Sequence, residues 1–202
     1  MNGELAILLA LLTPLIGALG ILATRKNPNK REAVTLVTSS ALFILVASLI
    51  SPVMTGIRPN VEVLEIVPGL KLAFEAEPLG LIFALIASGL WIVTSIYAIG
   101  YMRGHHETNQ TRFYTFFAIA LSSAVGVAFA ANMFTMFIFY EVLTLSTYPL
   151  VTHSGTAAAK RGGRTYLGIL LTTSIGFQLL AVIWTYISVG TLNFESGGIL
   201  EG

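Results

Sequence analysis

The chain has 202 residues, of which 55% are hydrophobic and 10% are charged, and its formal net charge is +1. Soluble domains carry roughly 25% charged residues, so these side chains cannot cover a water-soluble protein of this size. The charge balance also excludes a disordered chain and a nucleic-acid-binding protein. The absence of cysteine excludes disulfides and thiolate metal sites. An integral membrane protein remains.

Six segments have the length and apolar composition of a membrane-spanning helix, which needs about 20 such residues. They are residues 5–24, 33–55, 78–102, 113–131, 133–152 and 166–189. Asn132 separates the fourth segment from the fifth and can cap the fifth helix. The N-terminus is not basic and does not resemble a cleavable signal peptide, so we expect the first segment to stay as an anchor. The sequence therefore predicts an all-α polytopic membrane protein, with residues 1–202 in a single membrane domain.

The basic residues of the chain are unevenly divided between the two sides of a six-helix arrangement. The loops after the first, third and fifth segments hold Arg25, Lys26, Lys30, Arg31, Arg103, Arg112, Lys160, Arg161 and Arg164. The other side has only Arg58 and Lys71, and it collects most of the glutamates. Cytoplasmic loops carry the excess of Lys and Arg, so both termini are predicted to lie outside the cytoplasm.

The loop between the second and third segments predicts a short extracytoplasmic β-hairpin over about residues 61–77. Two runs flank the turn pair Pro68-Gly69, and in the second run apolar residues alternate with more polar ones. An isolated hairpin is marginal in water, so we expect this one to lie on another element or on a neighbouring subunit. An ordinary extracytoplasmic loop is the alternative.

Glu141 lies near the midpoint of the fifth segment, and the sequence predicts no other charged side chain well inside a spanning helix. An acid at the bilayer centre costs roughly 2.5–3.5 kcal/mol, so it needs a cationic partner, a water-filled cavity or a bound proton. Each of these outcomes favours a residue that handles protons. A neutral acid that only hydrogen-bonds between helices is the alternative.

Other polar side chains extend the predicted ion site along the fifth helix. Thr144 and Tyr148 share the face of Glu141 at helical spacing, and His153 at the cytoplasmic end could gate the uptake of protons. Ordinary interhelical hydrogen bonding is the alternative for the two hydroxyls, and an interfacial histidine without a role is the alternative for His153.

Two further groups of residues concern packing more than ion transfer. Ser122 and Gly126 belong to stripes of small residues in the fourth segment, which predict close helix–helix packing. Ser174, Gln178 and Thr185 are predicted on one face of the sixth helix, where Gln178 bonds either to an ion path or to a neighbouring helix. The sequence has no metal-binding triad, phosphate loop or nucleophile elbow.

The run from Asn132 to Val151, with Glu141 in its middle, resembles the antiporter-like subunits of respiratory complex I and its relatives. These relatives include the Mrp-type sodium/proton antiporters, whose D-type component is the most similar, and the membrane-bound hydrogenase and sulfur reductase complexes. The run from Tyr97 to Met102, followed by Arg112, carries the same resemblance, as does the predicted hairpin.

The resemblance implies an ion-translocating subunit that is not catalytic by itself and needs no cofactor, in the cell membrane of a prokaryote. In that family the residue matching Glu141 belongs to a proton path along the membrane midplane and pairs with a Lys on a later, broken helix. No Lys lies in the six segments, so we expect another membrane subunit to supply it. The lipid bilayer is the other expected partner.

The family fold has three leading helices and two inverted five-helix repeats, so this chain matches only its N-terminal part. A piece of a split subunit, a shortened product and an independent six-helix relative remain open. We expect the chain to contribute to translocation of protons, alone or with sodium, in an antiporter, hydrogenase, sulfur reductase or NADH dehydrogenase complex. The alternative is a structural scaffold subunit of the same kind of complex that carries no ions.

Overall fold

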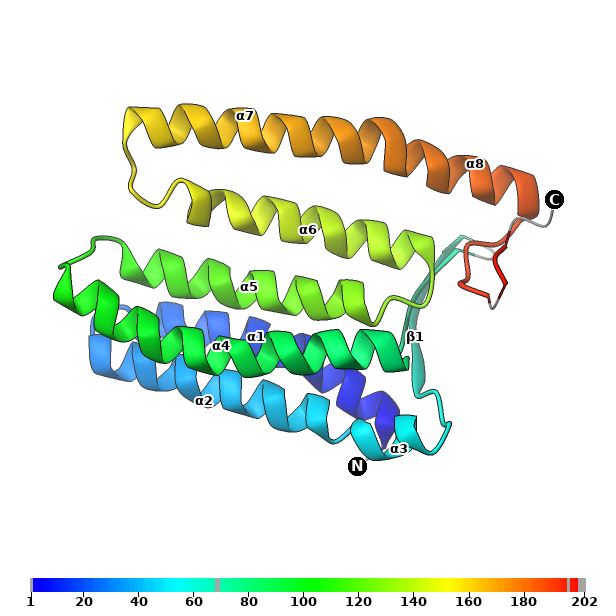
Figure 1. Cartoon of the computed structure of the whole chain (residues 1–202), viewed down its shortest axis with the longest axis horizontal. Helices are drawn as coiled ribbons and strands as arrows, with labels where there is room; N and C mark the ends of the chain where they lie inside the picture. The colour runs from blue at the N-terminus through cyan, green and yellow to red at the C-terminus, as the bar shows by residue number, and fades with distance from the viewer. Residues whose placement is uncertain (1, 68–69, 196, 200–202) are drawn as a thin grey trace.

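The computed structural model describes residues 2–67, 70–195 and 197–199. Within these residues, six helices are long and apolar enough to cross a membrane, and two strands form an antiparallel hairpin. The helices run side by side along one axis, with the hairpin at one end of the bundle (Figure 1). The predicted fold class, a mostly helical membrane protein with a β-hairpin, is confirmed.

Five long helices come first, and the β-hairpin lies in the connection between the second and the third. They are α1 (Gly3–Ala23), α2 (Pro28–Ala47) with its short extension α3 (Ile50–Met54), α4 (Pro78–Gly104), α5 (Gln110–Ala128) and α6 (Met133–Val151). The sixth long helix has three consecutive parts, which are α7 (Ala157–Thr173), the π-helical segment η1 (Ser174–Leu179) and α8 (Leu180–Val189).

Two helices begin well before their predicted starts, because N-capping residues precede the apolar runs. Helix α2 begins at Pro28 and not at residue 33, since the Asn27 side chain accepts a hydrogen bond from the backbone N–H of Lys30. Helix α7 begins at Ala157 and not at residue 166, since Thr156 caps it in the same way. Basic residues assigned to loops therefore lie in the first turns of helices.

The hairpin pairs β1 (Asn60–Val67) with β2 (Leu70–Glu75), and the predicted turn at Pro68 and Gly69 lies outside the described residues. The free edge of β2 bonds to the connection between α5 and α6, through Glu75 N to Phe129 O at 2.7 Å and Ala131 N to Ala73 O at 3.0 Å. The hairpin therefore lies on another element of its own chain, and it fixes the point where α6 begins.

The buried core lies among α1, α2, α4 and α5. Its largest fully buried side chains include Trp91, Leu42, Ile21 and Val125. Helix α6 joins this core through α5, and the sixth long helix lies beyond α6 at the edge of the bundle (Figure 1). Large apolar side chains of this last helix, such as Phe177 and Trp184, are exposed on the chain.

Candidate functional site

Glu141 lies near the middle of the 19-residue helix α6. Its Oε1 atom is buried and has no hydrogen-bond partner among the described residues, and none of the ion pairs found in this part of the chain involves Glu141. A buried polar atom without a partner in a native protein is generally satisfied by water, an ion or another chain. The carboxyl group of Glu141 is therefore available to such a partner.

The face of α6 that carries Glu141 is turned toward the sixth long helix. At the basic end, the side chains of Tyr148 and Thr152 lie against Gly163 of α7. At the other end, Phe137 forms a buried cluster with Val182 of α8. Glu141 shares this face at helical spacing and lies between the two contacts, and α6 contacts η1 between them as well. Glu141 is thus placed level with the π-helical segment.

The predicted polar neighbours of Glu141 divide into two sets. Thr144 is buried in α6, and it and Tyr148 lie on the Glu141 face. His153 lies beyond the end of α6 and turns toward α5, where its ring makes an edge contact with Phe113 at 5.7 Å between centroids. The structure brings the two hydroxyls to the face of the acid and places the histidine on another side.

His153 is half-buried at the basic end of the bundle, and its two buried ring nitrogens have no hydrogen-bond partner within the described ranges. Its backbone oxygen accepts a hydrogen bond from Arg112 Nη2 at 2.9 Å. Burial, together with the nearby Arg112 charge, lowers the pKa of His153 below its usual 6.5. A cavity of about 420 Å³, which Glu107 also lines, opens beside the ring.

Helix α6 is held against the core through small residues of α5. The Ser122 hydroxyl donates a hydrogen bond to Leu11 O of α1 at 2.7 Å. A side chain added at Gly126 would overlap the ring of Phe139 in α6. These contacts fix the backbone of the helix that carries Glu141.

Of the three polar residues predicted on one face of the sixth helix, Ser174 and Thr185 are buried and Gln178 is half-buried. The helix is π-helical from Ser174 to Leu179, so its residues do not follow a regular 3.6-residue period there. After this segment the residues clustered with Phe137 are Leu179, Val182 and Tyr186.

A second buried carboxylate, Glu32 of α2, was missed by the sequence analysis. Glu32 pairs with Arg103 of α4, whose Nε donates to Glu32 Oε1 at 3.1 Å, and with its neighbour Arg31. Arg31 in turn donates to Gln110 Oε1 of α5 at 2.6 Å. The sequence signal for this cluster was the capping pair Asn27-Pro28, which places Arg31 and Glu32 inside α2.

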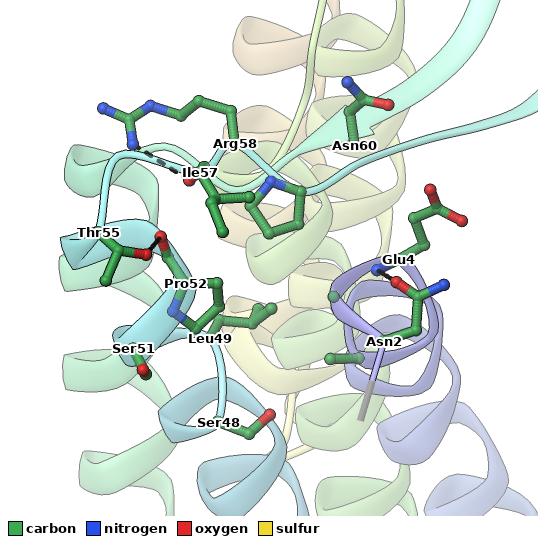
Figure 2. Close-up of a pocket in the computed structure, with 13 residues that line it drawn as sticks. Asn2, Glu4, Ser48, Leu49, Ser51, Pro52, Thr55, Ile57, Arg58 and Asn60 are labelled. Atoms are coloured by element: carbon green, nitrogen blue, oxygen red, sulfur yellow. Dashed lines mark hydrogen bonds between the residues drawn. The ribbon is translucent and has the colours of Figure 1, made fainter.

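At the opposite end of the bundle, a cavity of about 580 Å³ lies between the start of α1, α3 and the segment before β1 (Figure 2). Two of its polar side chains are engaged locally, since Arg58 donates to Ile57 O at 3.3 Å and Thr55 to Pro52 O at 2.8 Å. It does not include any residue of α6. No group of three or more His, Cys, Asp or Glu side chains that could hold a metal occurs in the described part of the chain.

Comparison with known proteins identifies proteins that are similar to this chain. No protein-family model matches the chain. Over 192 residues it is 27% identical to a Staphylococcus epidermidis protein named "Putative antiporter subunit mnhD2", and the match covers 94% of this chain and 37% of that protein. The chain is similar to the N-terminal part of antiporter-like subunits. It is also 29% identical over 132 residues to NADH-quinone oxidoreductase subunit N of Desulforudis audaxviator, covering 65% of this chain and 26% of that protein.

Two solved structures that contain antiporter-like subunits share the fold. The match to the Mrp complex from Dietzia sp. has a TM-score of 0.81 and 20% identity, and it covers 96% of this chain and 36% of the other. The match to the membrane-bound sulfane sulfur reductase, an archaeal respiratory membrane complex, has a TM-score of 0.75 and 20% identity, covering 92% and 28%. The chain thus spans little more than a third of the length of the first curated relative.

Proposed function

We propose that the chain contributes to proton or cation translocation as an antiporter-like subunit, or the N-terminal part of one, within a multi-subunit membrane complex. Glu141 is the acid that binds and releases the proton. The observation that carries the proposal is the buried Oε1 of Glu141 at mid-span, which has no partner among the described residues, in a chain similar to antiporter subunits.

The position of Glu141 suits reversible protonation. A buried carboxyl oxygen without a fixed partner in the described residues can receive a mobile or shared cation from another chain. Lys30 and Lys160 lie at helix ends, far along the chain from the middle of α6. A Lys supplied by another membrane subunit therefore acts as the cation that modulates Glu141.

The hydroxyls beside Glu141 indicate toward which end of the bundle the proton path leads. Thr144 and Tyr148 continue the face of Glu141 toward the end of the bundle that holds Arg31, Arg103 and Arg112. By the distribution of basic residues this end faces the cytoplasm of a prokaryotic cell, and both termini lie outside. His153 lies at the same end, where it controls access from the aqueous side.

The test is ion-coupled transport by membrane vesicles that contain the whole complex with Glu141→Gln. Glutamine keeps the shape and hydrogen-bonding capacity of the side chain but cannot exchange a proton. We expect transport to be lost while the amount of chain in the membrane is unchanged. Glu4→Gln is the matched control, because Glu4 is exposed at the start of α1, and it leaves transport intact. Normal coupling in Glu141→Gln overturns the proposal.

The second candidate is a scaffold subunit that carries no ions. The tight contact between Gly126 of α5 and Phe139 of α6 is the observation behind it, because this contact packs the helices of the chain and takes no part in ion transfer. In that case Glu141→Gln transports normally, and only a bulky residue at Gly126 lowers the amount of assembled complex.

A further inference from the structure

The face that the sixth helix turns toward α6 carries both polar and apolar side chains. Ser174 and Val182 are buried, each with 4% of its surface exposed, and Val182 forms a cluster with Phe137 of α6. Gln178 lies four residues from each of them, which is about one helical turn, and it is half-buried. Gln178 therefore belongs to the face of the sixth helix that lies on α6.

The register of the two helices puts Gln178 level with Glu141. From the contact between Phe137 and Val182, α6 and the sixth helix run in opposite directions along the chain (Figure 1). Glu141 lies one turn after Phe137, and Gln178 lies one turn before Val182. Helix α6 also contacts η1 itself, to which Gln178 belongs. The carboxyl group and the side-chain amide thus lie on facing sides at the same level.

The next turn of this contact, toward the basic end of the bundle, is polar on both helices. Thr144 follows Glu141 on α6 and is buried, with 4% of its surface exposed. Ser174 precedes Gln178 on the sixth helix, and its hydroxyl donates to Leu171 O at 3.3 Å. Toward the hairpin end the contact is apolar. Glu141 and Gln178 therefore lie where the contact between the two helices changes from apolar to polar.

Neither side chain of this pair has another partner in the part of the chain that the structure describes. The Oε1 atom of Glu141 is buried without a hydrogen bond, and the Gln178 amide makes none to the described residues. An ionised carboxylate only accepts hydrogen bonds, whereas a protonated carboxyl group also donates one. A primary amide both donates and accepts. Gln178 can therefore hold the carboxyl group before and after it binds a proton.

We propose that Gln178 is a positioning residue for Glu141, and that its side-chain amide hydrogen-bonds to the carboxyl group between α6 and η1. The π-helical geometry of η1 supports this, because π-helical turns within α-helices occur frequently at functional sites. The inference rests on the proposed role of Glu141 and deepens it. It names the group of this chain that holds the acid while the proton is exchanged.

Disulfide cross-linking tests the placement of the pair, because the natural chain has no cysteine. A disulfide needs two Cα atoms within about 7 Å of each other. We expect Glu141→Cys with Gln178→Cys to cross-link several-fold more than Glu141→Cys with Phe177→Cys, in membranes that contain the whole complex. Phe177 is the matched control, because it adjoins Gln178 and 74% of its surface is exposed. Equal yields overturn the placement and the inference with it.

Infrared difference spectra of the complex, recorded between acidic and alkaline pH, test the hydrogen bond. A protonated carboxyl group gives a C=O stretching band, and the band that Glu141→Gln removes belongs to Glu141. Gln178→Met keeps the length of the side chain but removes its amide, so we expect this band to move to higher wavenumber. Thr172→Val is the control, because Thr172 is exposed on the same helix, and it leaves the band in place.

Ion-coupled transport gives the second measurement. Gln178→Met should lower transport several-fold at a normal amount of chain in the membrane, whereas Thr172→Val transports normally. A Glu141 band that Gln178→Met leaves in place, or unchanged transport by this variant, overturns the inference while Glu141 keeps its proposed role. If Glu141→Gln removes no band, the proposed function itself fails and the inference fails with it.

Discussion

Glu32 and Glu141 are two carboxylates in helices of the same bundle, and they differ in their hydrogen-bond and charge partners. Glu32 accepts hydrogen bonds from two arginines and joins α2 to α4, inside the densely packed half of the molecule. Glu141 lies in α6, between that half and the sparsely packed sixth helix, and its buried oxygen has no partner in the described residues. A buried carboxylate with hydrogen-bond partners holds helices together. A buried carboxyl oxygen without a partner is available to bind water or a group of another chain.

Removal of the Glu32 charge should produce the largest loss of stability. Glu32→Gln leaves Arg31, which is buried like Glu32, without its counter-charge, and breaking a buried ion pair in this way costs about 3–5 kcal/mol. Arg103 is half exposed, so water screens the loss of its pairing. Thermal unfolding of the purified protein in detergent measures the effect. Glu141→Gln is the matched comparison and should unfold close to the unaltered chain. Equal losses in the two variants would break the distinction between them.

A bulky residue at the boundary between the two halves should have the next largest effect. Gly126→Val would force the ring of Phe139 out of its place, and such overpacking typically costs about 1–3 kcal/mol. Gly168→Val in α7 is the control, because no atom lies near a side chain built at that position. Thermal unfolding of each variant should give a clearly lower unfolding midpoint for Gly126→Val than for Gly168→Val. The reverse order would show that α6 is not held through α5.

His153 should make stability depend on pH in one direction. Its pKa in the folded chain lies below 6.5, since burial and Arg112 disfavour the imidazolium, with Glu107 opposing them weakly. Below about pH 6.5 the unfolded chain then binds more protons than the folded chain, so stability falls as the pH drops until the folded-state pKa is passed. His153→Gln should flatten this part of the curve of unfolding midpoint against pH. An unchanged curve would contradict the burial of the ring.

The surface ion pair of the hairpin should have the smallest effect. Lys71 Nζ contacts Glu62 at 2.8 Å, and this pair raises the pKa of Lys71, but Glu62 is exposed and Lys71 is partly exposed to solvent. Exposed pairs contribute little because water screens them and holding two flexible side chains costs entropy. Lys71→Ala should leave the unfolding midpoint unchanged within error, in contrast to Glu32→Gln. A loss comparable to that of Glu32→Gln would make the hairpin a stabilising element in its own right.

Much of the architecture follows from patterns that are local in the sequence. Apolar runs of spanning length predicted the six helices, and alternation from Leu70 to Ala76 predicted β2. Glu141 stood out because an acid in the middle of such a run is costly. Asn132 was expected to cap the helix that carries it, and its side chain accepts from the backbone N–H of Thr135 at 2.8 Å.

The rest depends on pairings between distant residues or on one-residue changes in helical geometry. Glu32 and Arg103 are 71 positions apart in the chain, and each alone resembles an ordinary charge at a membrane surface. The π-helical segment from Ser174 to Leu179 leaves composition unchanged, so no periodic pattern in the sequence predicts it. The pairing of Met133 N with Leu192 O likewise joins segments that no sequence pattern connects.

The comparison of the two carboxylates is tested most directly by transport per assembled chain, measured in vesicles for Glu141→Gln and Glu32→Gln side by side. The account predicts that Glu141→Gln abolishes transport per chain at a normal chain level, and that Glu32→Gln lowers the chain level while each remaining chain transports normally. Full transport per chain in Glu141→Gln would contradict it and leave the subunit as a scaffold.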